Sequence, residues 1–352
     1  MSGDAFPSRM RQEIEEQPAV IGRTLEALLP LVPDLRRVAD GRRHVLFIAR
    51  GSSDNAAVYG QYVCSLRGGR LGTLASPSVA TAYRARLDLS GVLAVAVSQS
   101  GATEEILEAM DWAGSCGART VAVTNVEGSP LATAADVALV TEAGVERAVP
   151  ATKTYTTQLA ALAVLGLALG DDDAALSELA AVPEAVDEAL RTAAAAEQLA
   201  GTLTFVDRLV VSGRGYASST ALELALKLKE ACYVAASGLS YADLLHGPIA
   251  VVDPSTPALL VAASDGPMLA GMTALAERVL SAGAWVYGIG GDGAFAATCS
   301  AWLPGTRLPE HLAPIALAVP GQLLVDALAR AKGIDPDAPR GLRKVTQTDT
   351  GD

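Results

Sequence analysis

The chain has 352 residues, half of them hydrophobic, and a formal net charge of −12. This length can bury one large core or two of ordinary domain size, and two cores is the better interpretation. The acidic balance excludes proteins that bind nucleic acid or anionic membranes through a basic surface. The longest apolar stretch, 159–169, is too short to span a bilayer, and the N-terminus lacks a signal peptide's apolar core. We therefore expect a soluble, cytoplasmic protein.

The first strand signals follow a helical segment that we expect at residues 1–35. Residues 36–170 alternate apolar runs with helical patterns, which predicts a first α/β domain. Within it, His44–Ile48 predicts a buried strand, and Gly51-Ser52-Ser53 forms the turn that follows.

A second strand-to-turn junction is the most informative segment. The apolar run 93–97 stops at Ser98-Gln99-Ser100-Gly101-Ala102-Thr103, and a helical pattern begins at Glu104. Such a turn can hold an anion, because free backbone N–H groups and the positive helix end meet three hydroxyls at one place. The same residues also suit an ordinary helix-capping turn. The candidate anion ligands are Ser98, Gln99, Ser100 and Thr103.

The chain then repeats itself after an Ala-rich helical linker at 171–202. A second α/β domain is expected at 203–335, followed by a tail at 336–352. The matching strand runs are 45–51 with 209–215, 93–98 with 259–264, and 120–124 with 284–288. An offset of about one domain length indicates a duplicated unit. We predict an α/β fold of two flavodoxin-like doubly wound parallel sheets, each with helices on both faces.

The two copies differ at the anion loop. The second copy carries Ser264-Asp265-Gly266-Pro267, which has fewer hydroxyls, a carboxylate, and a proline without an N–H donor. We therefore expect one anion site per chain, in the first copy.

Three charged residues in the second copy share one stripe of a predicted helix. Glu223, Lys227 and Glu230 are spaced i, i+4 and i+7. A surface salt-bridge ladder has the same spacing, but here the surrounding helix is apolar, which favours a functional role. Glu230 lies roughly 20 Å along the helix from Gly215, so it cannot serve the turn that begins its own helix. We expect it to serve the cleft of the first copy.

Two further residues are candidates for chemistry. His246 precedes Gly247-Pro248 in a loop before an expected strand at 249–252, and its ordinary pKa near neutrality suits proton transfer. A solvated loop histidine is the alternative. Lys344 follows a proline-containing approach that favours packing of the tail on the body of the protein. No His/Cys/Asp cluster has metal-ligand spacing, so we expect neither a metal nor a redox cofactor.

Six motifs, in order over nearly the whole chain, resemble the SIS (sugar isomerase) domain family. The similarity is to the isomerase half of glucosamine-6-phosphate synthase and to stand-alone deaminase-type relatives. The motifs are 44–55, 98–103, 151–158, 221–230, 243–248 and 339–346.

The resemblance implies a sugar phosphate as ligand and assigns roles to single residues. Glu230 would transfer the proton, with Lys227 beside it, and Lys344 would join the open-chain ketose as an imine. His246 would open the sugar ring from the neighbouring subunit, which implies a homodimer with shared active sites. The substrate-binding residues would be Gly51, Ser52, Ser53, Ser98, Gln99, Ser100, Thr103, Ala151 and Glu223.

Departures from the synthase suggest the reaction. Met1-Ser2 offers no N-terminal cysteine nucleophile, and 11–18 resembles the start of the isomerase half, so we expect no glutaminase domain. Pro150-Ala151 replaces an Ala-Ser pair and removes a hydroxyl. The expected activity is a glucosamine-6-phosphate deaminase that yields fructose 6-phosphate and ammonia. The alternatives are a fructosamine-phosphate deglycase, another amino sugar phosphate isomerase of the same chemistry, and a non-catalytic sugar-phosphate sensor.

Overall fold

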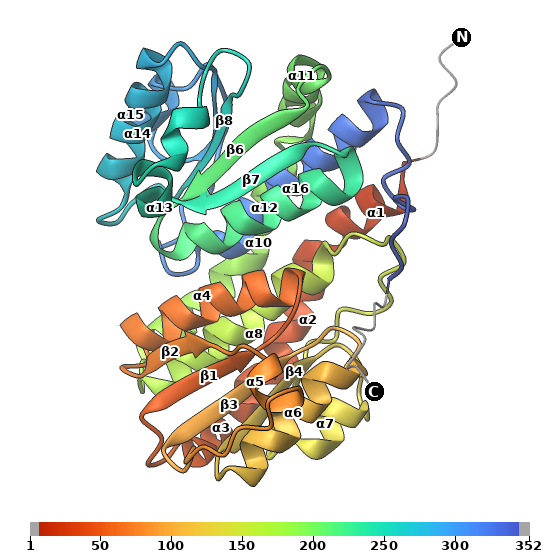
Figure 1. The fold of residues 1–352 in the computed structure, drawn as a ribbon, viewed down its shortest axis with the longest axis vertical. Helices are drawn as coiled ribbons and strands as arrows, with labels where there is room; N and C mark the ends of the chain where they lie inside the picture. Colours follow the sequence, from red (N-terminus) through yellow and green to blue (C-terminus); the bar gives the residue numbers. More distant parts are fainter. Residues whose placement is uncertain (1–6, 345–352) are drawn as a thin grey trace. The chain divides into compact units, whose positions relative to one another are not determined.

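The computed structural model describes residues 7–344, which fold around two separate parallel sheets (Figure 1). The chain divides into two compact units that are interleaved along the sequence. We call residues 19–144 and 154–181 the N-terminal unit. Residues 7–18, 145–153 and 182–344 form the C-terminal unit.

The N-terminal unit is built on five parallel strands in the order β2-β1-β3-β4-β5. They are β1 (His44–Ile48), β2 (Leu71–Leu74), β3 (Val92–Val97), β4 (Arg119–Thr124) and β5 (Val137–Val140). Every residue of β3 after Val92 is buried, as expected for a strand with both faces covered. Because β1 pairs with both β2 and β3, the strand order reverses between β1 and β3. Open α/β sheets bind ligands at such a switch point.

The helices of the N-terminal unit connect its strands and cover the sheet. They are most of α2 (Gln17–Leu28), the 3₁₀ turn Leu29–Leu31, α3 (Val32–Val38), α4 (Ser52–Leu66), α5 (Ser78–Thr81), α6 (Glu104–Ser115), α7 (Pro130–Ala134), α8 (Lys153–Leu169), α9 (Asp173–Glu178) and the turn Leu179–Ala181. Residues of α6 pack with β3 and β4 in a core cluster that includes Ile106, Met110, Ala94 and Ala122.

The C-terminal unit repeats this topology with the strand order β10-β9-β8-β6-β7. Its strands are β6 (Arg208–Gly213), β7 (Ala235–Ser240), β8 (Ala258–Ala262), β9 (Val286–Gly290) and β10 (Ala301–Leu303). Counted from its first strand, each sheet has the order 2-1-3-4-5 of flavodoxin-like folds. The predicted duplication of a doubly wound parallel sheet is confirmed.

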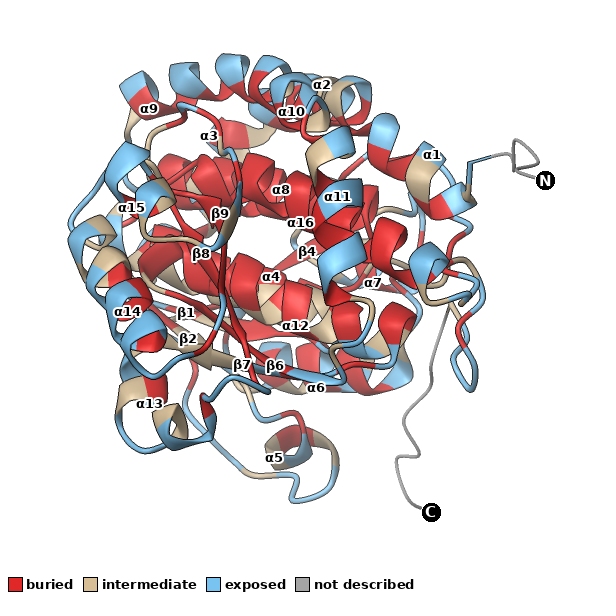
Figure 2. Cartoon of the chain, turned by 90° about the horizontal axis from the view of Figure 1, so that it is seen from above, coloured by how far each residue is buried: buried red, intermediate tan, exposed pale blue. Residues whose placement is uncertain are grey.

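The C-terminal unit holds the longest described helix, which is buried over most of its length. Its helices are α1 (Arg9–Glu15), α10 (Val182–Leu190), α11 (Ala193–Leu203), the turn Gly215–Ala217, α12 (Ser218–Cys232), α13 (Tyr241–Leu245), the turn Pro248–Val251, α14 (Leu269–Ser281), α15 (Gly293–Ala297) and α16 (Ala313–Ala331). Among the described residues, α16 alone is long and apolar enough to cross a membrane, but 94% of its apolar window is buried in the protein. Figure 2 shows this helix in the buried colour along its length, which is the pattern of a core helix.

One expected strand is absent. Residues 249–252, predicted as a strand after His246, lie largely in the 3₁₀ turn Pro248–Val251. Gly247 has a φ of +131°, and Pro248 has no N–H to donate to a sheet. The chain therefore turns at this point instead of extending.

The contact between α8 and α4 gives a stability prediction. A Cβ on Gly166 would lie 2.6 Å from Cγ1 of Val63, so Gly166→Ala overpacks the N-terminal unit. We expect the free energy of unfolding, measured by urea denaturation, to fall by about 1–3 kcal/mol. Gly201→Ala on the exposed side of α11 is the matched control, because no atom lies within 4 Å of its Cβ. That change should stabilise the helix by up to about 1 kcal/mol, and a loss equal to that of Gly166→Ala would refute the packing argument.

Candidate active site

The anion loop, Ser98–Thr103, joins the end of β3 to the start of α6. Gly101 has a φ of +61°, and a Cβ there would lie 2.2 Å from Oγ of Ser129. Only glycine fits this tight turn, which brings the loop to the first N–H groups of a twelve-residue helix. The structure therefore has the strand-loop-helix geometry expected of an anion site.

The hydroxyl groups of this loop lie close together. Oγ of Ser98 lies 3.4 Å from Oγ1 of Thr103, and Oγ of Ser100 accepts a 3.3 Å hydrogen bond from the N–H of Ala102. Thr103 is the N-cap residue of α6, yet its side chain makes no capping hydrogen bond. Its hydroxyl is not used by the helix end. Gln99 is fixed by its backbone carbonyl, which accepts a 3.1 Å hydrogen bond from the N–H of Asn125.

A second turn, at Gly51, follows β1 at the same switch point of the sheet and leads into Ser52 and Ser53, the first residues of α4. Nε2 of Gln158 donates a 3.0 Å hydrogen bond to Oγ of Ser53. Arg50 pairs with the buried Glu105 of α6 through two hydrogen bonds of 3.0 and 2.8 Å. This bidentate pair links the two loops that the sequence assigned to the substrate. No local pattern in the sequence marks the pair, because its members are 55 residues apart.

The second copy of the anion loop has a carboxylate beside it. A Cβ on Gly266 would lie 2.3 Å from Oε2 of Glu310, and a Cβ on Gly215 would lie 3.3 Å from Oε1. Burial and the nearby Asp265 raise the pKa of Glu310. An anion would meet this group at the switch point of the second sheet, which supports the prediction of one anion site per chain.

The three charged residues on α12 form a buried cluster and not a surface ladder. The side chains of Glu223 and Lys227 are only 1% and 2% exposed, whereas that of Glu230 is 23% exposed. Nζ of Lys227 lies 3.6 Å from Oε1 of Glu223 and donates a short hydrogen bond to Oε2 of Glu230. One buried ammonium therefore holds the partly exposed carboxylate in place.

The charge of Lys227 is set by its neighbours. Burial alone would lower the pKa of Lys227, but the carboxylates of Glu223 and Glu230 outweigh this effect and raise it. Glu146 contributes in the same direction. The amine is therefore an ammonium at neutral pH, and it is the positive charge that contacts Glu230.

His246 is exposed at the C-terminal end of α13. Its backbone N–H donates to the carbonyls of Ala242 and Asp243 at 3.2 Å. Within residues 7–344 its imidazole makes no hydrogen bond or ion pair, so the structure does not join it to Glu230 or Lys344. Its predicted role in ring opening stays a prediction.

Lys344 is the last described residue, and its amine is docked. Nζ lies 2.5 Å from Oε2 of Glu146 and donates a 2.8 Å hydrogen bond to the carbonyl of Ala148. Oε1 of Glu146 accepts hydrogen bonds from the backbone N–H of Thr152, at 2.9 Å, and from its hydroxyl, at 3.1 Å. Ala151, a predicted substrate-binding residue, directly precedes Thr152 and is half-buried. The predicted packing of the tail is thus seen in the structure.

The approach to Lys344 is held by two further contacts. The N–H of Val149 donates to the carbonyl of Asp337 at 3.1 Å. The guanidinium of Arg340 lies over the ring of Tyr233, 4.4 Å from its centroid. The backbone N–H of Arg340 donates a 2.8 Å hydrogen bond to the hydroxyl of Tyr233. Tyr233 is the left-handed C-cap of α12, so the tail is tied to the end of the helix that carries Glu230. The last residues of the motif at 339–346 lie outside the described residues.

Glu146 is the functional candidate that the sequence analysis missed. It lies in a loop, 198 residues before Lys344, so it is not part of a helical or strand pattern in the sequence. The available signal was its place just before Pro150-Ala151-Thr152, the start of a recognised motif.

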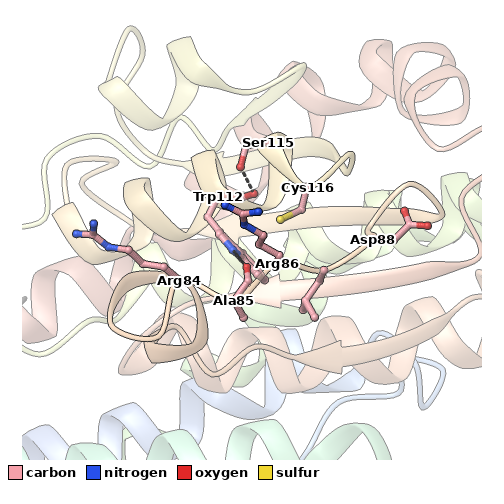
Figure 3. Close-up of a pocket in the computed structure, with 8 residues that line it drawn as sticks. Arg84, Ala85, Arg86, Asp88, Trp112, Ser115 and Cys116 are labelled. Atoms are coloured by element: carbon pink, nitrogen blue, oxygen red, sulfur yellow. Dashed lines mark hydrogen bonds between the residues drawn. The ribbon is translucent and has the colours of Figure 1, made fainter.

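The open pocket in Figure 3 belongs to the N-terminal unit, and no residue of the anion loop lines it. It adjoins the C-terminal end of α6, roughly 18 Å from the anion loop at the other end of that helix. Its lining residues are Arg84, Ala85, Arg86, Leu87, Asp88, Trp112, Ser115 and Cys116, none of which the sequence assigned to a site. In the described part of the chain, no three His, Cys, Asp or Glu side chains gather as metal ligands.

The buried cluster on α12 predicts a pH-dependent loss of stability. Lys227→Met leaves the carboxylates of Glu223 and Glu230 without their ammonium, which should cost about 3–5 kcal/mol near neutral pH. The cost arises from carboxylate charge that has lost its ammonium, so it is absent where the carboxyls are protonated. Their destabilisation therefore grows as pH increases above the unfolded value near 4.5. Urea denaturation at about pH 7.5 and about pH 5 should show the larger loss at the higher pH.

Lys229→Met is the control for this measurement, because Lys229 lies on the same helix but is exposed. It should change stability by less than about 0.5 kcal/mol at either pH. A loss in Lys227→Met that does not vary with pH would show that lost packing, and not unpaired charge, is the cause.

Comparisons with known proteins match both α/β units of the chain. The SIS domain model matches residues 40–168 and 202–290. The glutamine–fructose-6-phosphate aminotransferase (isomerizing) of Thermococcus kodakarensis is 34% identical over 353 residues, which cover 96% of this chain and 58% of that protein. The chain thus spans less than two thirds of this relative.

Solved structures are similar to nearly the whole chain as well. The C-terminal domain of glucosamine-fructose-6-phosphate aminotransferase from Francisella tularensis superposes with a TM-score of 0.88 at 28% identity, covering 96% of this chain and 100% of that one. Glucosamine-6-phosphate deaminase from Thermotoga maritima gives a TM-score of 0.78 at 26% identity, with 97% and 100% coverage. From its fold, its paired loops and these matches, the chain belongs to the SIS domain family.

Proposed function

We propose that the protein is a phosphosugar isomerase that acts as a glucosamine-6-phosphate deaminase and yields fructose 6-phosphate and ammonia. The observation that carries the proposal is the ammonium of Lys227, which is 2% exposed and holds the partly exposed carboxylate of Glu230. Removing charges from water is costly, so the pair is weak evidence for a role in stability alone, and we assign it a role in function. A fixed, ionised carboxylate is what a proton-transfer step requires.

The proposed mechanism assigns one task to each group. The hydroxyls and N–H groups of the anion loop bind the phosphate, and His246 opens the sugar ring. Glu230 carries the proton from C2 to C1. The resulting imine is hydrolysed, and Lys344 takes part through its amine.

The relatives support this choice of substrate class. The Thermotoga maritima structure is described as a glucosamine-6-phosphate deaminase, and the Thermococcus kodakarensis relative as an aminotransferase of fructose 6-phosphate. Both names combine a hexose 6-phosphate with a reaction of an amino group. In our proposal His246 completes the site of a neighbouring subunit, as the family resemblance implies, so the active form is at least a dimer.

The anion loop gives the first functional prediction. Changing both Ser100 and Thr103 to Ala removes two hydrogen bonds to the phosphate, each worth about 1.5–3 kcal/mol. Affinity for glucosamine 6-phosphate, measured by calorimetry, should fall by at least about tenfold. Ser264→Ala in the second copy is the matched control and should leave affinity unchanged. Equal losses in the two variants would contradict a single phosphate site.

The second prediction tests the chemistry. Glu230→Gln keeps the shape of the side chain but cannot accept a proton, so ammonia release should fall by on the order of 100-fold or more. Exchange of the C2 hydrogen with deuterated water should be lost as well. Glu277→Gln, on the exposed side of α14, is the control and should retain both activities.

A panel of amino sugar phosphates and fructosamine phosphates decides the substrate in the same assay. Turnover of a fructosamine phosphate alone would replace the deaminase with a deglycase. A wild-type protein that binds these phosphates without turnover or exchange would be a sensor, and the proposal would be wrong.

A further inference from the structure

The carboxylate of Glu146 contacts the amine of Lys344 from a fully buried position. Its side chain is 0% exposed, and Oε2 lies 2.5 Å from Nζ. Oε1 accepts both hydrogen bonds from Thr152. The two oxygens therefore have separate partners, and the donors on Oε1 fix the direction in which Oε2 points.

Lys344 has one other acceptor, the carbonyl of Ala148 at 2.8 Å. A carbonyl oxygen can accept a hydrogen bond from an ammonium, but it cannot take up the proton. In the described part of the chain, Glu146 is the sole carboxylate paired with Lys344. It is therefore the group placed to change the protonation of this amine.

The need for such a group follows from imine chemistry, and this step rests on the function proposed above. A lysine is an ammonium at neutral pH, whereas only the neutral amine can attack a carbonyl carbon. An acceptor must lie within hydrogen-bond reach of the proton that it removes.

We propose that Glu146 is the proton acceptor and donor for imine formation at Lys344. Oε2 takes one proton from the ammonium, and the freed nitrogen pair bonds to C2 of the open-chain ketose while the C2–O π pair moves onto oxygen. A second N–H proton moves to that oxygen to give the carbinolamine. The Glu146 carboxyl then returns its proton to the C2 hydroxyl, which leaves as water, and the nitrogen pair forms the C=N bond of a protonated imine.

A neighbouring Glu–Lys ion pair differs from this one in its exposure to solvent. Lys153 follows Thr152 in the sequence and pairs with Glu16 at 2.6 Å. The side chain of Glu16 is 52% exposed and is therefore in contact with solvent, whereas that of Glu146 is not. Glu16→Gln is thus a matched control that removes a Glu–Lys pair next to the loop of Glu146.

In the experiment, borohydride reduces the imine in the presence of fructose 6-phosphate, which leaves the sugar covalently attached. Mass spectrometry of the peptide that contains Lys344 then measures the rate of trapping. Glu146→Gln should slow trapping by on the order of 100-fold, the scale of a lost general acid–base group. KM should change by less than about threefold, since the phosphate is bound elsewhere. Glu16→Gln should trap at the wild-type rate, and Glu146→Asp should recover part of the loss.

The pH profile separates proton transfer from positioning. In Glu146→Gln, trapping should rise by about tenfold per pH unit below the lysine pKa, because solvent must remove the proton. A profile parallel to that of the wild type would overturn the proposal. Thermal melting shows whether the variants fold, and Glu146→Asp provides the test if Glu146→Gln does not.

The outcomes also distinguish this inference from the proposed function. Wild-type ammonia release without trapping at Lys344 would overturn the inference and leave the deaminase intact. Trapping at Lys344 that depends on Glu146, without ammonia release from any amino sugar phosphate, would support the inference and refute the deaminase.

Discussion

The buried ammonium of Lys227 is the interaction on which the arrangement of the C-terminal unit depends. It contacts Glu223 one turn before it and Glu230 nearly one turn after it, so α12 must stay helical across all three positions. The apolar residues between these charges, such as Leu224 and Leu228, are buried as well. The same helix therefore stabilises the unit and presents a carboxylate, and any change that bends it affects both properties.

Much of the architecture could be predicted because strand periodicity and turn chemistry are local properties. The apolar runs marked the central strands, and the turn at 98–103 marked the anion loop. Pairings between distant residues could not be predicted in this way. Glu146 with Lys344 and Arg50 with Glu105 are set by chain topology, which periodicity does not report. The turn at Pro248 was missed because a short apolar run has no period of its own.

The interleaving of the two units has a physical basis in the loop at 145–153. This segment lies between elements of the N-terminal unit in sequence, but its partners are in the C-terminal unit. Glu13 illustrates the dependence: it is buried, and burial raises its pKa although the N–H groups of Arg147 and Ala148 donate to it. A single cut in the chain would therefore separate neither unit with all of its contacts.

The carboxylate of Glu310 at the second switch point explains how the two copies of the sheet can differ in function. Two identical copies of the sheet would have two equivalent anion loops. A single reaction centre needs only one of them. In this chain the carboxylate of Glu310 lies beside Gly266 of the second loop, so a second anion would meet an acidic side chain there. The two copies therefore differ in their chemistry: the first presents hydroxyl groups at its switch point, and the second carries a buried charged cluster on α12.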